Sequence, residues 1–318
     1  MLYDARSGAA SSVQTCQAHT DAVLCAVATP DGVRAISSGA DRSTKVWDLG
    51  LNRVEGVLGK FSNAYARQKT YGTCLAVTAD SHRVVVGLTD STATIFLIQT
   101  REELRKITLG GMPRALCLSD DGMLVFAGFD SGMAEAHEIQ CCVRLATFVV
   151  GGGAVRDLCV TDQSQRTLYA GRSDGRMIPV SMAKDEPVQK LVAGSSEVLS
   201  LLVLNNETAV AGHRDGTVRR WSIASGQVER EYKGHADAVT CVASGLDDTF
   251  ITGSVDNTVR VWDSNTGCEV RRIGGDYVQP PINVAMSPDG TKVAVVQMPF
   301  EMQAGSVHFP NVYDFQSG

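Results

Sequence analysis

The segment Ser-Ser-Gly-Ala-Asp-Arg-Ser-Thr-Lys-Val-Trp-Asp at residues 37–48 has a near copy at residues 252–263, Thr-Gly-Ser-Val-Asp-Asn-Thr-Val-Arg-Val-Trp-Asp. Each copy is predicted to form a strand, a tight polar turn and a second strand of alternating residues that ends in Trp-Asp. A hairpin repeated along a chain is typical of folds built from many small sheets. This repeat therefore decides the fold.

Weaker copies of the hairpin fill the rest of the chain. The residues aligned at the tryptophan position lie 41 to 51 residues apart and are Trp47, Phe96, His137, Val180, Trp221, Trp262 and Tyr313. A propeller blade of four strands takes roughly 40–45 residues. The sequence therefore predicts an all-β fold, a seven-bladed β-propeller of four-stranded antiparallel blades.

At these residues the chain resembles the WD-repeat (WD40-type) β-propeller family, and the resemblance covers nearly all of it. In that family four residues of a blade form a hydrogen-bonded relay between the incoming loop and the central hairpin, a network that is favourable only when every member is satisfied. The resemblance implies one relay in the first unit and one in the sixth: His19, Ser37, Asp41 and Trp47, and His235, Thr252, Asp256 and Trp262.

The other units depart from the relay pattern. The second has Val86 and Phe96 where the family prefers a hydroxyl and a tryptophan, and the next three have alanine at the hydroxyl position, namely Ala127, Ala170 and Ala211. We expect these blades to depend more on apolar packing against their neighbours.

The two ends of the chain predict how the ring closes. The seventh unit has no outer strand after Tyr313, whereas residues 12–17 alternate like such a strand and have no blade of their own. We expect residues 12–17 to close the last blade, which would remove the open sheet edges. Residues 1–11 then form a leftover repeat segment or terminal extension beside a single propeller at 12–318. This division indicates one propeller taken from, or lying next to, a longer repeat protein.

The nine cysteines are odd in number and contain no Cys-x-x-Cys pair, which disfavours both a disulfide framework and a metal site. Five of them lie among small apolar residues on one face of the predicted innermost strands: Cys25, Cys74, Cys117, Cys159 and Cys241. We expect buried, reduced thiols and therefore a reducing compartment, the cytoplasm or the nucleus.

Composition and charge limit the class of protein. No segment approaches the roughly 18 apolar residues of a membrane span, and no basic region followed by an apolar stretch marks a signal peptide. The net charge of −6 disfavours a nucleic-acid surface, which usually carries a basic excess. A nucleophile elbow, a phosphate-binding glycine loop and a zinc-protease motif are all missing from the sequence. We therefore expect a protein that is not an enzyme and needs no cofactor or metal.

Loops held on a rigid scaffold favour binding. We expect a protein–protein interaction platform or scaffold subunit of a larger assembly, whose partners are proteins or peptide segments. The alternative is a recognition or sensor propeller of a longer multidomain protein, such as a ubiquitin-ligase substrate receptor. Residues 2–6 resemble the Trp-Asp-x-Arg box that docks on a ligase adaptor, with Tyr3 in place of tryptophan.

The main candidates for partner binding are an aromatic residue and three basic or imidazole side chains on the predicted top-face turns of the third to fifth units: Phe129, Arg172, His213 and Arg214. This mixture suits a partner segment with an acidic residue and an apolar anchor, because aromatic and arginine contacts dominate interface energetics. The alternative is that all four are ordinary solvated turn residues.

Two further loops are candidates. The entry loop of the second unit carries Arg67 and Lys69 beside Tyr71, and it is predicted to be either an interaction site or a solvated insertion. The lengthened loop of the seventh unit carries Met298 and Phe300, which either form a contact surface or fold back to cap the channel.

Overall fold

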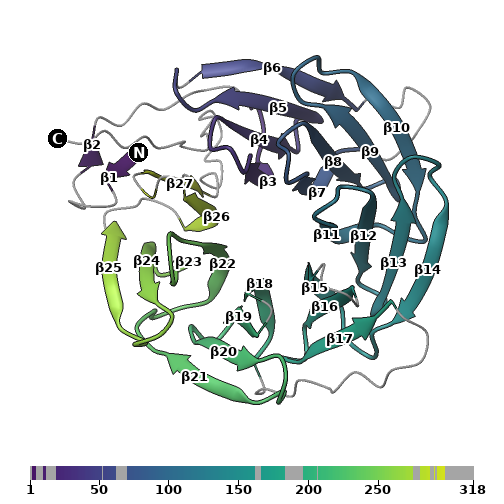
Figure 1. The fold of residues 1–318 in the computed structure, drawn as a ribbon. Helices are drawn as coiled ribbons and strands as arrows, with labels where there is room; N and C mark the ends of the chain where they lie inside the picture. Colours follow the sequence, from purple (N-terminus) through teal and green to yellow (C-terminus); the bar gives the residue numbers. More distant parts are fainter. Residues whose placement is uncertain are drawn as a thin grey trace.

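The computed structural model describes residues 2–4, 10–11, 19–51, 53–61, 70–161, 166–182, 196–205, 207–274, 280–286, 290 and 292–297. Within these ranges every regular element is a β-strand, and every pair of strands is antiparallel. The small sheets stand around a central axis as a ring (Figure 1). The prediction of an all-β propeller is confirmed.

Six blades are each built from consecutive strands. Blade one contains β3 (Val23–Ala28), β4 (Arg34–Gly39), β5 (Ser43–Asp48) and β6 (Arg53–Lys60). Blade two contains β7 (Gly72–Val77), β8 (Arg83–Leu88), β9 (Thr92–Leu97) and β10 (Glu103–Thr108). Blade three contains β11 (Pro113–Leu118), β12 (Leu124–Phe129), β13 (Met133–Glu138) and β14 (Arg144–Val149).

The remaining three follow around the ring (Figure 1). Blade four contains β15 (Val155–Thr161), β16 (Thr167–Arg172) and β17 (Met177–Ser181). Blade five contains β18 (Val198–Asn205), β19 (Thr208–His213), β20 (Val218–Ser222) and β21 (Val228–Tyr232). Blade six contains β22 (Val239–Ser244), β23 (Thr249–Ser254), β24 (Thr258–Asp263) and β25 (Glu269–Gly274).

The prediction of seven four-stranded blades closed by one N-terminal strand is wrong. Besides the six blades, of which the fourth has three strands among the described residues, there is one composite sheet drawn from both ends of the chain. Its order is β26 (Pro281–Met286), β27 (Lys292–Gln297), β1 (Leu2–Asp4) and β2 (Ala10–Ser11). Because β26 contacts both β22 and β3, this composite sheet lies between blades six and one.

The error in the closure prediction has a definite cause. The strand pattern Leu-Tyr-Asp at residues 2–4 is almost the same as Val-Tyr-Asp at residues 312–314, so alignment alone could not decide which of them occupies the third place in the sheet. In the structure Tyr3 pairs with Val293 of β27 on one side and with Ala10 of β2 on the other. Residues 12–17 and 312–314 lie outside the described residues.

Apolar side chains, mostly on the three inner strands of each blade, form the core between neighbouring blades. Val85 and Ile95 of blade two, for example, pack with Leu116 and Val125 of blade three. The residues that carry this packing are almost fully buried, as expected for sheets covered on both faces. Interdigitation of neighbouring blades therefore holds the ring together.

Every innermost strand has a β-bulge at its second residue. A bulge leaves one residue without a place in the ladder and redirects its side chain. In blades three and four that residue is an arginine, Arg114 and Arg156 respectively, whereas in the other inner strands it is uncharged: Leu24, Thr73, Leu199, Thr240 and Ile282.

The third residue of the innermost strand links one blade to the next. The Asp157 carboxylate accepts the backbone N–H of Leu201 at 2.7 Å, and the Ser200 hydroxyl accepts the backbone N–H of Val242 at 3.0 Å. The five cysteines of the innermost strands lie on β3, β7, β11, β15 and β22, and the eight described cysteines are free thiols. Burial raises the pKa of Cys74 and of Cys241 to about 12, which makes both thiols poor nucleophiles.

Candidate functional site

Blade one contains a closed hydrogen-bonded network around His19. Its Nδ1 lies 3.0 Å from the Asp41 carboxylate and its Nε2 lies 2.7 Å from Ser37 Oγ, which also accepts the indole N–H of Trp47 at 2.7 Å. Asp41 accepts the backbone N–H of Thr20 as well. The loop before β3 is thereby fastened to β4, to β5 and to the turn between them.

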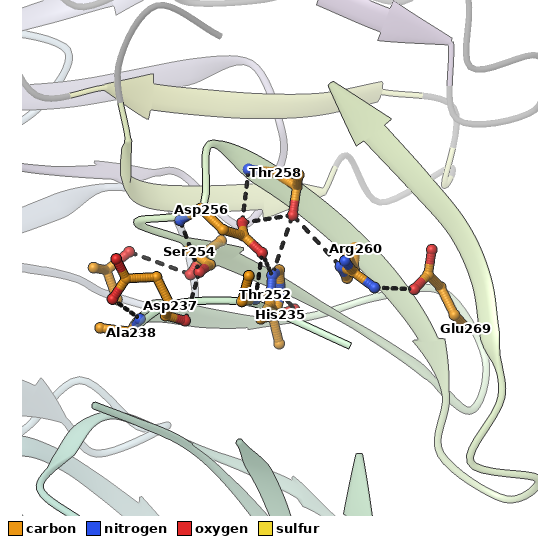
Figure 2. A network of polar contacts seen from close by, with 12 residues as sticks. His235, Asp237, Ala238, Thr252, Ser254, Asp256, Thr258, Arg260 and Glu269 are labelled. Atoms are coloured by element: carbon orange, nitrogen blue, oxygen red, sulfur yellow. Dashed lines mark hydrogen bonds and ion pairs between the residues drawn. The ribbon is translucent and has the colours of Figure 1, made fainter. Parts of the chain in front are cut away.

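Blade six repeats this geometry with a threonine (Figure 2). His235 Nδ1 lies 2.9 Å from Asp256, and its Nε2 lies 2.7 Å from Thr252 Oγ1, which accepts the Trp262 indole N–H at 2.8 Å. Thr258 Oγ1 lies 3.1 Å from His235 Nδ1 and donates to Asp256 at 2.7 Å. The structure therefore brings each set of four relay residues together.

The electrostatics of the blade-one relay favour a neutral His19 imidazole and an ionised Asp41 carboxylate. Burial lowers the pKa of His19 in spite of its bond to Asp41. Burial alone would raise the pKa of Asp41, but hydrogen bonds from Ser43 and His19 outweigh it and hold that pKa well below its usual range. The Asp256 carboxyl pKa is lowered in the same way, by hydrogen bonds with His235 and Thr258. Each donor and acceptor is already used, so the relay is suited to holding a loop in place.

Blade three has a different buried network, centred on Glu135. The carboxylate accepts the backbone N–H of Gly110 at 3.0 Å, lies 3.0 Å from His137 Nε2 and accepts a bond from Arg144 at 2.8 Å. These contacts outweigh the effect of burial and lower the Glu135 pKa. Glu135, which is not among the site residues predicted from the sequence, stands where blades one and six have a basic residue, Lys45 or Arg260, and that reversal of charge is the sequence feature that could have indicated this network.

Three of the four residues predicted to form a top-face cluster occupy one equivalent position, the last residue of the second strand. Phe129, Arg172 and His213 are only 4%, 6% and 0% exposed. They therefore offer almost no surface to a partner. Instead, each contacts the loop that enters its own blade.

The three contacts differ in chemistry. The Phe129 ring lies against Gly111, where an added Cβ would be 3.5 Å from the ring. Arg172 Nη1 donates to the carbonyl of Val150 at 3.1 Å, and its Nη2 binds Asp174. His213 Nδ1 lies 3.0 Å from the Ser196 carbonyl. In these blades, which lack the relay hydroxyl, the end of the second strand anchors the entry loop.

Arg214, the fourth predicted residue, is exposed and belongs to a chain of ion pairs across three blades. Arg114 Nε donates to Asp130 at 2.7 Å, and Asp130 also lies 3.8 Å from Arg156 Nη1. Arg156 Nε donates to Glu197 at 2.6 Å, and Glu197 accepts a second bond from Arg214 at 2.8 Å. We call these five residues the arginine arc.

The arc lies on the same face of the ring as the relays, because Asp130 occupies the same turn as Asp41 and Asp256. Its guanidinium groups are accessible, with 42% of the Arg114 side chain exposed, 37% of Arg156 and 70% of Arg214. Glu197 is largely buried, which would raise its pKa, but the bonds from Arg214 and Arg156 outweigh burial and lower it. Three cations thus share two carboxylates, on a chain whose net charge is −6.

The other predicted loop residues give little information. Arg67, Lys69, Met298 and Phe300 lie outside the described residues. The backbone N–H of Tyr71 donates to Thr89 Oγ1 at 3.2 Å, which fixes the start of blade two.

The described part of the chain has no helix with the length and apolar character that a membrane span requires. Within the same part, no three His, Cys, Asp or Glu side chains converge in a way that could hold a metal ion.

A ring of antiparallel blades, two of which hold the His, Ser or Thr, Asp and Trp relay, is the architecture of WD-repeat β-propellers, which generally serve as protein-interaction scaffolds and are generally non-catalytic. The chain accordingly matches the WD40 family model, described as "WD domain, G-beta repeat", at residues 10–48 and 226–263. The second segment covers the relay hairpin of blade six, and the first covers that of blade one.

Solved structures share the whole architecture. "Crystal structure of RRP9 WD40 repeats" superposes with a TM-score of 0.80 at 16% sequence identity, covering 96% of this chain and 97% of the other. "Structure of U3-55K" gives a TM-score of 0.79 at 17% identity, covering 94% and 97% of the two chains. At such identity the likeness concerns the fold. The comparison with curated proteins gave no match.

Proposed function

We propose that the protein is a non-catalytic interaction scaffold, a subunit of a larger assembly that binds a partner protein through the arginine arc. The observation that carries this proposal is the exposed guanidinium groups of Arg114, Arg156 and Arg214 on adjacent blades. Exposed arginines that are held in a fixed orientation favour carboxylate recognition, because a guanidinium can donate two parallel hydrogen bonds.

The partner segment should be acidic. Asp130 and Glu197 already hold the three arginines in place, so binding requires no reordering of long side chains, and a partner carboxylate would balance the positive excess of the arc. The bulges at Arg114 and Arg156 set these two side chains at the inner edge of the ring.

Quantitative affinity purification tests this function. The wild-type chain is compared with a triple variant, Arg114→Glu, Arg156→Glu and Arg214→Glu, and with a control triple variant at exposed outer-strand arginines, Arg53→Glu, Arg105→Glu and Arg272→Glu. We expect a stoichiometric partner whose recovery falls at least about tenfold, or 1.4 kcal/mol, in the arc variant alone. Equal recovery by the two variants would rule out the arc, and recovery of no partner even at low salt would contradict the scaffold role.

We further propose that the protein works in a reducing compartment, the cytoplasm or the nucleus. The odd number of cysteines supports this, together with the distribution of five of them over separate innermost strands. Imaging of a fluorescent fusion in cells tests the proposal, and secretion of the fusion would contradict it.

The ligase-adaptor alternative gains no support from the described residues. Leu2–Asp4, the first part of the candidate box, form β1, which is paired on both edges with β27 and β2.

A further inference from the structure

The outer strand of blade three, β14, differs from the other outer strands in its charge. β6, β10, β21 and β25 each contain three charged residues, whereas β14 contains one, Arg144, at its first position. Charged side chains on an edge strand normally prevent other strands from adding to it. Among the outer strands of the four-stranded blades, β14 is thus the least protected.

The edge of β14 is both apolar and accessible. Leu145 is 50% exposed and Val149 is 78% exposed, Thr147 between them is exposed as well, and the ladder with β13 shifts register at Leu145. On the outer side β14 pairs with no strand of the described residues, and it forms the rim of the ring in Figure 1. Its backbone N–H and C=O groups on that side can therefore pair with another chain.

The opposite side of β14 fixes its position. Ala146 and Phe148 pack against the apolar cluster between blades three and four, which includes Val150 and Leu168. Since β14 is held by this packing and by its ladder with β13, a strand that added to it would meet a preformed template.

One charge indicates the chemistry at the end of an incoming strand. Arg144 Nη1 binds the buried Glu135 at 2.8 Å, yet 55% of the Arg144 side chain is exposed. A guanidinium has five N–H donors, so the exposed part of this group can bind a second carboxylate.

We propose that β14 accepts an antiparallel strand from a partner protein, with apolar residues opposite Leu145, Thr147 and Val149 and a carboxylate opposite Arg144. Antiparallel pairing matches every ladder of the ring and is the more stable arrangement. The backbone ladder supplies affinity and the alternating side chains supply specificity. This surface is separate from the arginine arc.

A synthetic peptide provides the test: fluorescein-labelled Val-Thr-Val-Thr-Val-Asp-amide, titrated with the full chain and followed by anisotropy. We expect binding with a Kd below about 1 mM. The double variant Leu145→Lys, Val149→Lys should bind at least about tenfold more weakly with an unchanged Tm, because both side chains are exposed. A peptide that ends in Lys should also bind more weakly.

The decisive control is the same peptide with alternate backbone nitrogens methylated, which cannot form the ladder. The methylated peptide should not bind, whereas the unmethylated peptide should slow hydrogen exchange of the β14 amides. Equal binding of the methylated peptide would show that the peptide binds through apolar contacts without a backbone ladder, and it would overturn the proposal. Dimerisation of the wild-type chain in sedimentation, abolished by the lysine variant, would assign the edge to a second copy and overturn it as well.

Discussion

His213 Nδ1 lies 3.0 Å from the carbonyl oxygen of Ser196 and thereby attaches the entry loop of blade five to the end of β19. In blade six the histidine belongs to the loop and binds a hydroxyl on the strand, whereas here the histidine belongs to the strand and binds the loop. Two arrangements of the same side chain thus serve one structural purpose in neighbouring blades.

The first prediction concerns the buried polar atoms that this arrangement leaves without a hydrogen-bond partner. His213 Nε2 and the Trp221 indole N–H are buried and have no hydrogen-bond partner among the described residues, and Ala211 stands at the relay hydroxyl position. We expect Ala211→Ser to supply an acceptor and to stabilise the protein by about 1 kcal/mol, measured by urea unfolding. Ala170→Ser is the matched control, because blade four has no tryptophan to satisfy. A gain of the same size in the control would contradict this account.

The second prediction tests the relay of blade six. Asp256→Ala should leave His235 and the backbone N–H of Ala236 without a hydrogen-bond partner. We expect the free energy of unfolding, measured by calorimetry, to fall by about 1–3 kcal/mol. The turn aspartate of blade two, Asp90, bonds to Thr92 and Lys106 at the surface, so Asp90→Ala should cost less. The reverse order would show that the Asp256 network is not what holds its blade.

The third prediction is a pH dependence at Asp157. Burial raises the pKa of this carboxyl to about 6, although the backbone N–H groups of Leu201 and Leu158 and the Ser200 hydroxyl all favour its ionised form. Since the unfolded value is about 3.9, the folded state binds the extra proton between roughly pH 4 and pH 6. Stability therefore falls as the pH rises through that window.

Urea unfolding of Asp157→Asn against wild type measures this contribution. The difference in unfolding free energy should shift by about 2–3 kcal/mol in favour of the variant between pH 4 and pH 7.5. A constant difference across that range would show that the carboxyl titrates normally.

The fourth prediction concerns closure of the ring. Deletion of residues 1–11 removes β1 and β2 and exposes the edge of β27. We therefore expect the free energy of unfolding to fall by about 3 kcal/mol and the protein to aggregate on heating. Replacement of residues 5–9 by a Gly-Ser linker of equal length keeps both strands and should cost much less. Similar melting temperatures for the two variants would contradict the observed pairing of Tyr3 with Val293.

The relay could be located from the sequence because its hydroxyl, aspartate and tryptophan stand at fixed distances within one hairpin, and its histidine precedes the hydroxyl by 18 residues in blade one and by 17 in blade six. A fixed distance along two paired strands translates directly into a fixed distance in space. Hydroxyl, imidazole and indole groups at such positions have few alternative partners. The structure accordingly places His19 within 2.7 Å of Ser37.

The arc could be recognised only in part. Arg214 is evident on its turn, but Arg114 and Arg156 owe their position to a bulge in the inner strand, and β-bulges have no strong sequence pattern. Phe129, Arg172 and His213 were expected at the surface because turns are usually solvated. Burial there depends on how closely the entry loop approaches, which alternation within a strand does not reveal.

The composite sheet has a consequence for biosynthesis. β1 leaves the ribosome before every other described strand, yet its partner β27 begins at Lys292. During translation β1 cannot pair with β27 until almost the whole described chain has emerged. Until then the composite sheet between blades six and one is incomplete. A nascent chain stalled before residue 292 would thus display an open β-sheet edge to chaperones, however well its six blades had folded.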